Sequence, residues 1–194
     1  MYVDDLILAS ASPRRSQLLQ QLGVRFLIEP AHIDEICLKD EAAVEFVTRM
    51  ALEKAYKVSH GQSATIPVLG ADTIVLSEGN IFSKPESYDQ AREMLLSLSD
   101  NHHQVLSSVA IVNGEKSAVL VSETKVWFRT VSEAECLAYW RTGEPEDKAG
   151  AYAIQGYGAV FVERIEGSYS GVVGLPIAET SQLLHQFEIP MWQS

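Results

Sequence analysis

Cysteine is scarce in this sequence, with Cys37 and Cys136 as its two examples. They form no CxxC pair, so neither a disulfide framework nor a cysteine-rich zinc site is expected. Both thiols are interpreted as small core residues or inert side chains. A chain of 194 residues is long enough to fold around an ordinary apolar core without such cross-links.

Long apolar runs are also missing. A membrane-spanning helix needs ~20 apolar residues, and no stretch approaches that length. The start, Met1-Tyr2-Val3-Asp4-Asp5, carries acids where a secretory signal peptide carries bases. We therefore expect a cytoplasmic protein that has no membrane partner.

Basic residues are few. The chain has 15 Lys and Arg against 26 Asp and Glu, for a formal net charge of −11. Binding a nucleic acid polymer needs a basic face, and the longest basic run here is Arg14-Arg15. Polymeric nucleic acid is therefore not an expected partner, although a few concentrated cations could still bind one small anion.

The remaining composition is that of a globular protein, with 46% hydrophobic and 21% charged residues. Patterning predicts strands mixed with helices and several hairpins, which indicates an α/β fold with a mixed sheet. We expect one domain over residues 1–194, made of two lobes that share this sheet. Strands are predicted over 5–10, 24–29, 68–76, 103–112, 117–129, 152–154 and 159–164, and helices over 12–22, 41–59, 87–97, 132–142 and 176–187.

The first candidate site is the run Ser10-Ala11-Ser12-Pro13-Arg14-Arg15, between a predicted strand and a predicted helix. A helix N-terminus carries free N–H groups and a partial positive charge. Hydroxyls and two guanidiniums at that point would make an anion site, and phosphate is the natural guest. The alternative is an ordinary capped helix with two solvated arginines.

Asp72 is the second candidate. It lies inside the apolar run 68–76, where a carboxylate is costly unless it is paired or binds a cation. On a regular strand it shares a face with Gly70 and Ile74. The alternative is an Asp that caps a turn at the end of a strand.

Three further charged residues are weaker candidates. Pro85 forces an extended backbone at Lys84 and so aims its ammonium, although most such lysines are solvated. Lys54 lies just off the apolar stripe of its helix, a position that is also compatible with a surface lysine. Glu35, beside Asp34, is either the acidic half of a Mg²⁺ or Mn²⁺ site or simply part of a loop.

Gln155 is the last candidate. It stands among small residues that would let a flat ring approach, and its amide can both donate and accept, as the edge of a pyrimidine requires. The residues alone favour a plain glycine-containing bend at this point.

Five ordered blocks carry a resemblance to a known family. Together with their surroundings they span residues 6–184 and are similar to the signature of Maf-type nucleoside triphosphate pyrophosphatases. The blocks are SASPRR at 10–15, GADTIV at 70–75, KP at 84–85, DKAGAY at 147–152 and GLP at 174–176.

The resemblance implies an elongated mixed sheet, a central cleft between two lobes, and hydrolysis of a nucleotide to the monophosphate and pyrophosphate with a divalent metal, Mg²⁺ or Mn²⁺. It also implies a homodimer. The roles that it implies are proton acceptor and metal ligand for Asp72, metal or water handling for Glu35, triphosphate binding for Ser10, Arg14, Arg15, Lys54 and Lys84, and base specificity for Arg14, Thr73 and Gln155.

Arg14 and Gln155 also bear on the substrate. They resemble the dTTP/UTP branch of the family, whereas the branch that prefers 7-methyl-GTP carries Trp and Glu there. The expected substrates are therefore dTTP and UTP, including modified uridine triphosphates. Two alternatives stay open: a nucleotide-sensing regulator of septum formation with little turnover, and a house-cleaning pyrophosphatase for damaged purine nucleotides.

Overall fold

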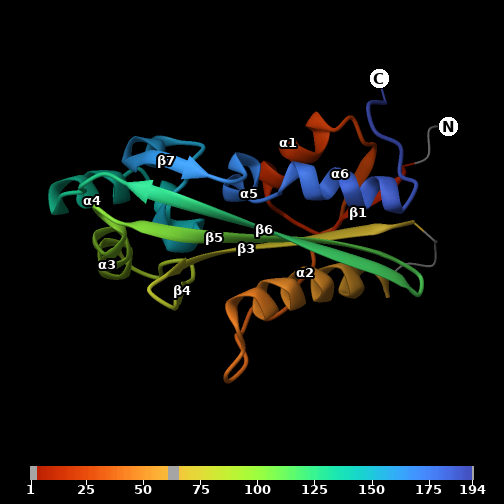
Figure 1. Ribbon diagram of the computed structural model, residues 1–194, viewed down its shortest axis with the longest axis horizontal. Helices are drawn as coiled ribbons and strands as arrows, with labels where there is room; N and C mark the ends of the chain where they lie inside the picture. The colour runs from red at the N-terminus through yellow and green to blue at the C-terminus, as the bar shows by residue number, and fades with distance from the viewer. Residues whose placement is uncertain (1–3, 61–65, 194) are drawn as a thin grey trace. The chain divides into compact units, whose positions relative to one another are not determined.

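The computed structural model describes residues 4–60 and 66–193. Residues 1–3, which entered the argument against a signal peptide, lie outside this part. The described chain contains a seven-stranded sheet in the order β2-β1-β3-β5-β6-β7, with β4 paired to β3. The predicted α/β class with a mixed sheet and flanking helices is confirmed (Figure 1).

The elements follow the predicted order closely. The strands are β1 (Leu6–Leu8), β2 (Phe26–Ile28), β3 (Val68–Ser77), β4 (Asn80–Phe82), β5 (His102–Asn113), β6 (Lys116–Phe128) and β7 (Val162–Glu166). The α-helices are α1 (Pro13–Gln21), α2 (Ala43–Ser59), α3 (Tyr88–Leu98), α4 (Glu133–Trp140), α5 (Tyr169–Val173) and α6 (Ile177–Gln186). Three short 3-10 helices are η1 (Glu144–Asp147), η2 (Ala149–Ala151) and η3 (Tyr157–Phe161). Among the described residues, no helix has the length and apolar character needed to span a bilayer.

Local sequence signals explain several of these boundaries. Ser132 and Glu135 form the expected capping box, in which each side chain accepts a hydrogen bond from the other residue's backbone N–H. Pro13 occupies the first turn of α1, where its missing N–H costs nothing. Gly114, with φ of 60°, makes the tight turn between β5 and β6.

The predicted strand over 152–154 is wrong, and the one over 159–164 is only partly right. Residues 152–154 are buried without joining the sheet, and η3 precedes β7. Positive φ angles at Gly150 (69°) and Ala151 (59°) turn the chain away from strand geometry just before this run. The apolar character of residues 152–154 therefore reflects burial and not pairing in the sheet.

The contacts divide the chain into two compact units. The first unit comprises Met1–Asp72, Ser107–Ser122 and Gly174–Ser194. The second comprises Thr73–Leu106 and Glu123–Val173.

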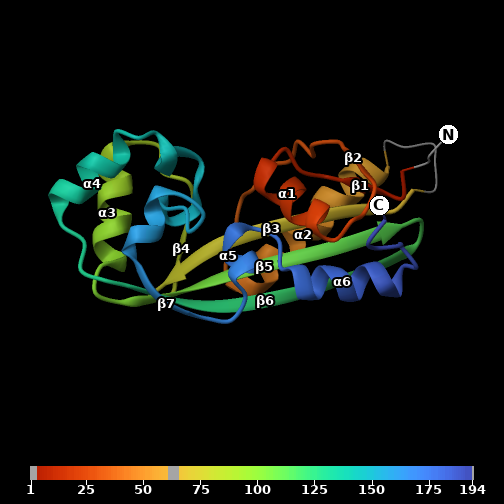
Figure 2. The ribbon, with the colours of Figure 1, turned by 90° about the horizontal axis from the view of Figure 1, so that it is seen from above.

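In the first unit, parallel strands build the core. β1 pairs in parallel with both β2 and β3, and Leu6 and Leu8 are fully buried. Helix α2 covers one face of these strands, while α1 and α6 lie on the other (Figures 1 and 2). A cluster of small and branched side chains joins β1 and β3 to α2, and it includes Ile7, Ala55 and Val68. Not every apolar side chain of α2 faces this core: Val44, in the first turn of the helix, is 49% exposed.

Gly70 sets how closely α2 approaches β3. A Cβ added to Gly70 would lie 2.2 Å from the backbone oxygen of Ala51 and 2.8 Å from the backbone nitrogen of Ala55. The helix backbone therefore rests directly on the strand at this point, as only glycine allows.

The second unit has an aromatic core. Phe128 packs edge-on against Tyr152, with ring centroids 4.7 Å apart, and against His103 at 5.0 Å. His103 is 1% exposed, and its Nε2 shares a hydrogen bond of 2.8 Å with the hydroxyl of Tyr152. Burial, with a lesser contribution from His102, lowers the pKa of His103 to about 4. The ring is therefore neutral in the folded protein at pH 7.

Replacing Gly70 by Ala is expected to lower the free energy of unfolding by about 1–3 kcal/mol, because α2 must move away from β3. Urea unfolding measures this change. Adding Ala55→Gly should not restore stability, since the closest contacts are with backbone atoms. A stability within about 0.5 kcal/mol of the wild type would contradict the close approach.

His103 is expected to make the protein less stable in mild acid. Between pH 6.5 and pH 4 the unfolded chain binds a proton at this ring and the folded chain does not. The free energy of unfolding should therefore fall by about 2 kcal/mol from pH 7 to pH 5 through this group. Urea denaturation at a series of pH values measures this change. In His103→Gln the free energy of unfolding should lose this part of its pH dependence, whereas the control His102→Gln, at an exposed position, should keep most of it.

Candidate functional site

The turn between β1 and α1 is organised around the hydroxyl of Ser10, which is 7% exposed. Its Oγ accepts a hydrogen bond from the backbone N–H of Ser12 and another from Nη1 of Arg15, each at 3.2 Å. Nε of Arg15 donates to the backbone oxygen of Gly174 at 2.9 Å. Ser12 is the N-cap of α1, but its side chain makes no capping bond. The N-terminus of α1, with its partial positive charge, is therefore not capped by the side chain of Ser12 and could interact with an anion.

Arg15 is half-buried beside acidic groups. Burial lowers its pKa, the negative charges of Asp72 and Glu35 act in the opposite direction, and Arg14 adds to the lowering. A guanidinium stays charged in proteins even so. A cation in the first turn opposes the helix dipole, and these two carboxylates offset that cost.

Lys54 joins the two candidate acids. Its Nζ donates to Oδ1 of Asp72 at 2.7 Å and contacts Oε1 of Glu35 at 2.7 Å. Lys54 and Asp72 are each 5% exposed, whereas the side chain of Glu35 is 45% exposed. A carboxylate in this apolar run was expected to be paired or to bind a cation, and Lys54 is its partner.

The interpretation of Lys54 as a surface lysine is wrong. Gly70 brings α2 so close to β3 that Lys54, beside Ala55, lies against the strand instead of pointing to solvent. Periodicity placed Lys54 just off the apolar stripe of α2. Its burial could not be predicted from that position, because it depends on the distance between α2 and β3.

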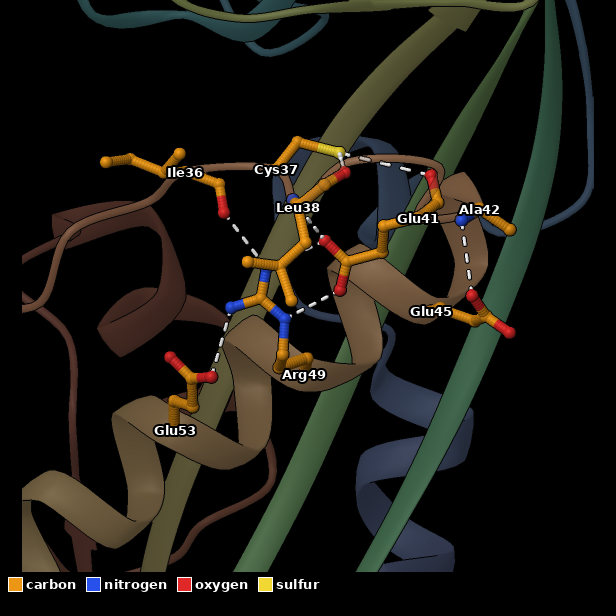
Figure 3. Close-up of polar contacts among 8 residues, drawn as sticks. All are labelled: Ile36, Cys37, Leu38, Glu41, Ala42, Glu45, Arg49 and Glu53. Atoms are coloured by element: carbon orange, nitrogen blue, oxygen red, sulfur yellow. Dashed lines mark hydrogen bonds and ion pairs between the residues drawn. The ribbon is translucent and has the colours of Figure 1, made fainter.

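The loop that carries Glu35 is held by Arg49 of α2. Nε and Nη2 of Arg49 donate to the two carboxylate oxygens of Glu41 at 2.6 and 2.7 Å, and Nη1 donates to Glu53 at 3.0 Å. Nη2 also donates to the backbone oxygen of Ile36 at 2.9 Å, directly after Glu35 (Figure 3). Hydrogen bonds from Arg49 are the main cause that lowers the pKa of Glu41 to about 2. This bidentate pair therefore fastens the loop at neutral pH.

Arg49 and Gly174 are contributors that the sequence analysis did not identify as site residues. Arg49 lies eight positions from its partner Glu41, across the start of a helix, so no helical spacing links them. Gly174 acts through its backbone oxygen, which leaves no trace in side-chain chemistry. The GLP block around it was the one available signal.

The remaining predicted site residues belong to the second unit. Lys84 and Gln155 are exposed, and Thr73 is half-buried directly after Asp72 in β3. The backbone N–H of Gly150 donates to the oxygen of Ser83 at 3.2 Å, which ties the DKAGAY block to the segment before Lys84. The structure thus brings Ser10, Arg15, Lys54, Asp72 and Glu35 together in the first unit, and Arg14 adjoins them on α1.

The carboxylates of Asp72 and Glu35 are the groups of this cluster that suit a metal ion. Within residues 4–60 and 66–193, no group of three or more His, Cys, Asp or Glu side chains is arranged to hold a metal ion. Asp72 and Glu35 converge on one ammonium, and Mg²⁺ is commonly held by one or two carboxylates together with substrate phosphate. The donor pair therefore suits a cation that arrives with a phosphorylated ligand.

Comparisons with known proteins match nearly the whole chain. A protein from Hahella chejuensis (strain KCTC 2396) named dTTP/UTP pyrophosphatase is 50% identical over 96% of this chain and 94% of its own length. Proteins of the same name from Saccharophagus degradans and Vibrio vulnificus (strain YJ016) are 46% and 47% identical, over 98% and 94% of this chain and 92% and 98% of their own lengths.

One solved structure has a weaker similarity. The nucleoside-triphosphatase / dITP/XTP pyrophosphatase from Mycobacterium abscessus is 15% identical, covers 94% of both chains and has a TM-score of 0.46.

A family model also matches the chain. The model described as Maf-like protein matches residues 5–187, which include every block of the sequence signature. The chain therefore belongs to the Maf-like protein family.

Proposed function

We propose that this chain is a nucleoside triphosphate pyrophosphatase that hydrolyses dTTP and UTP to the monophosphate and pyrophosphate. The observation that carries the proposal is the contact of the buried Lys54 with both Asp72 and Glu35, beside the N-terminus of α1. The three relatives named dTTP/UTP pyrophosphatase support the choice of substrate. A buried carboxylate that faces cations is suited to an enzyme in which the carboxylate activates water and the cations bind phosphate.

The triphosphate is the part of the substrate that the cations would bind. Ser10 and the N-terminus of α1 offer neutral donors, and Arg14 and Arg15 offer charge. Lys54 adds an ammonium from α2, and Lys84 is proposed to add another from the second unit. Because a triphosphate carries close to four negative charges, several cations are needed to hold it against the acidic net charge of the protein.

Asp72 is proposed as the proton acceptor. Lys54 bonds Oδ1, which leaves Oδ2 to take a proton from the attacking water. The water oxygen bonds to the α-phosphorus, the bond from that phosphorus to the bridging oxygen breaks, and pyrophosphate leaves with the electron pair. Lys54 keeps the carboxylate oriented through this step and places positive charge beside the phosphates.

Asp72 and Glu35 are proposed to hold a divalent cation, Mg²⁺ or Mn²⁺, together with phosphate oxygens. When bound, such a cation neutralises phosphate charge and lowers the pKa of water. The Arg49–Glu41 pair keeps Glu35 in place for this role by fastening the loop directly after it.

Gln155, Thr73 and Arg14 are proposed to select the base. The exposed amide of Gln155 can donate to a carbonyl oxygen and accept from a ring N–H, which matches the edge that thymine and uracil share. A cytosine presents the opposite pattern at those two atoms and should be used less well.

The proposal is tested by pyrophosphate release from dTTP, UTP, CTP, GTP, 7-methyl-GTP and ITP with Mg²⁺ or Mn²⁺. Fast release from dTTP and UTP supports it. Binding of dTTP without turnover would overturn it in favour of a nucleotide sensor. Preferential release from ITP would favour a pyrophosphatase for damaged purine nucleotides.

Asp72→Asn is expected to lower kcat for dTTP by about 10²-fold or more, the scale of a lost general base. Steady-state pyrophosphate release measures this loss. The exposed Asp89→Asn, on α3, is the matched control and should retain wild-type turnover. Retained activity in Asp72→Asn would remove Asp72 from the mechanism.

Gln155→Glu is expected to lower kcat/KM for dTTP and UTP by about tenfold, because a carboxylate cannot donate to the base carbonyl. Inhibition by inorganic tripolyphosphate, which has no base, should change much less. Equal losses for tripolyphosphate and for every nucleotide would refute a role in reading the base.

A further inference from the structure

Two side chains hold the segment that carries Gln155. On one side of Gln155, the backbone N–H of Ala153 donates to the hydroxyl oxygen of Tyr139 at 3.1 Å, in a buried position. The hydroxyl of Tyr139 in turn donates to Oε1 of Glu144 at 2.7 Å. A continuous hydrogen-bond chain thus runs from the backbone before Gln155 to the carboxylate of Glu144.

The same carboxylate holds the other side of Gln155. The backbone N–H of Tyr157 donates to Oε2 of Glu144 at 3.0 Å, and that of Gly158 donates to Oε1 at 2.9 Å. Partial burial acts to raise the pKa of Glu144, but the hydrogen bonds from Tyr139, Gly158 and Tyr157 lower it overall. Glu144 is therefore a carboxylate at neutral pH that accepts three hydrogen bonds, two of them from the loop.

Two glycines let the segment come this close. A Cβ at Gly156 would lie 2.2 Å from Oε2 of Glu144, and one at Gly158 would lie 2.6 Å from the hydroxyl oxygen of Tyr139. The glycines beside Gln155 are therefore required by the contact with these two side chains, rather than by the freedom of a bend.

The two holding side chains are themselves fixed. Tyr139 lies on α4, is 5% exposed, and packs edge-on against Phe161 with ring centroids 5.1 Å apart. Glu144 begins η1 directly after Gly143, and its N–H donates to Oγ1 of Thr142 at 3.2 Å. Helix α4 and the turn that follows it thus form a rigid support for the loop.

We infer that Tyr139 and Glu144 are positioning residues for base selection, acting through Gln155. The inference rests on the proposed function, in which Gln155 reads the base. Gln155 is exposed, and the backbone around it decides where its side chain begins and therefore which region its amide can reach. Holding that backbone at Ala153, Tyr157 and Gly158 fixes the point from which the side chain extends before the substrate arrives, which lowers the entropy cost of binding the base.

Glu144→Gln tests this with almost no change of shape. Its amide nitrogen must face at least one of the N–H or O–H donors, so a hydrogen bond is lost and the segment loosens. KM for dTTP is expected to rise by about threefold to tenfold while kcat changes less than about twofold. CTP should be affected little, so the dTTP-to-CTP ratio of kcat/KM falls. Tyr139→Phe should act in the same direction.

A second background separates positioning from general damage. In Gln155→Ala, adding Glu144→Gln should leave the dTTP-to-CTP ratio unchanged, because the group through which Glu144 acts is gone. Glu133→Gln is the matched control: it lies on α4 in an exposed ion pair with Arg92 and should keep the wild-type ratio. Thermal unfolding of each variant verifies that the protein is folded.

The outcomes distinguish this inference from the proposed function. If the wild type releases pyrophosphate from dTTP and Gln155→Ala lowers the ratio, but Glu144→Gln and Tyr139→Phe do not, the positioning role is overturned alone. An equal fall of the ratio with and without Gln155 would also overturn it. If the wild type does not hydrolyse dTTP, the proposed function fails and the inference fails with it.

Discussion

The first unit depends on the buried ion pair between the ammonium of Lys54 and the carboxylate of Asp72. Taking this charge and that of Asp72 out of water costs several kcal/mol per ion, and removing either partner of such a pair costs about 3–5 kcal/mol. The contact exists because Gly70 lets the backbone of α2 rest on β3, which puts Lys54 within 2.7 Å of the carboxylate. Glu35 then supplies a second acceptor for the same ammonium.

Helix α1 shows the complementary arrangement. Arg15 stands in its first turn, where a cation opposes the helix dipole, and it is stabilised by Asp72 and Glu35 together with hydrogen bonds to Ser10 and Gly174. Cations, carboxylates and a helix N-terminus therefore converge in the first unit. Such a cluster suits a polyanionic substrate, because the donors are already oriented and little reorganisation is needed on binding.

In the second unit, the loop that carries Gln155 is held by hydrogen bonds to a hydroxyl and to one carboxylate, that of Glu144. Glu144 accepts from Tyr139, Tyr157 and Gly158, while the aromatic cluster around Phe128 supplies the core beneath. In the first unit the electrostatics of a few charges dominate, whereas here hydrogen bonds to backbone N–H groups decide the local structure. The two kinds of support correspond to the two tasks proposed, holding phosphate and reading a base.

The sequence by itself determined the class of fold, most element boundaries and the need of Asp72 for a partner or a cation. Caps, a proline in the first turn and a tight glycine turn act locally, so they can be read without the rest of the chain. An acid inside an apolar strand predicts a partner for the same reason. Only the tertiary structure decided which partner it has, since Lys54 is 18 residues away and its burial depends on the distance between α2 and β3. The same holds for Arg49 with Glu41 and for Tyr139 with Ala153: these contacts join segments whose spacing has no periodic signature, and they form only when packing brings the segments together.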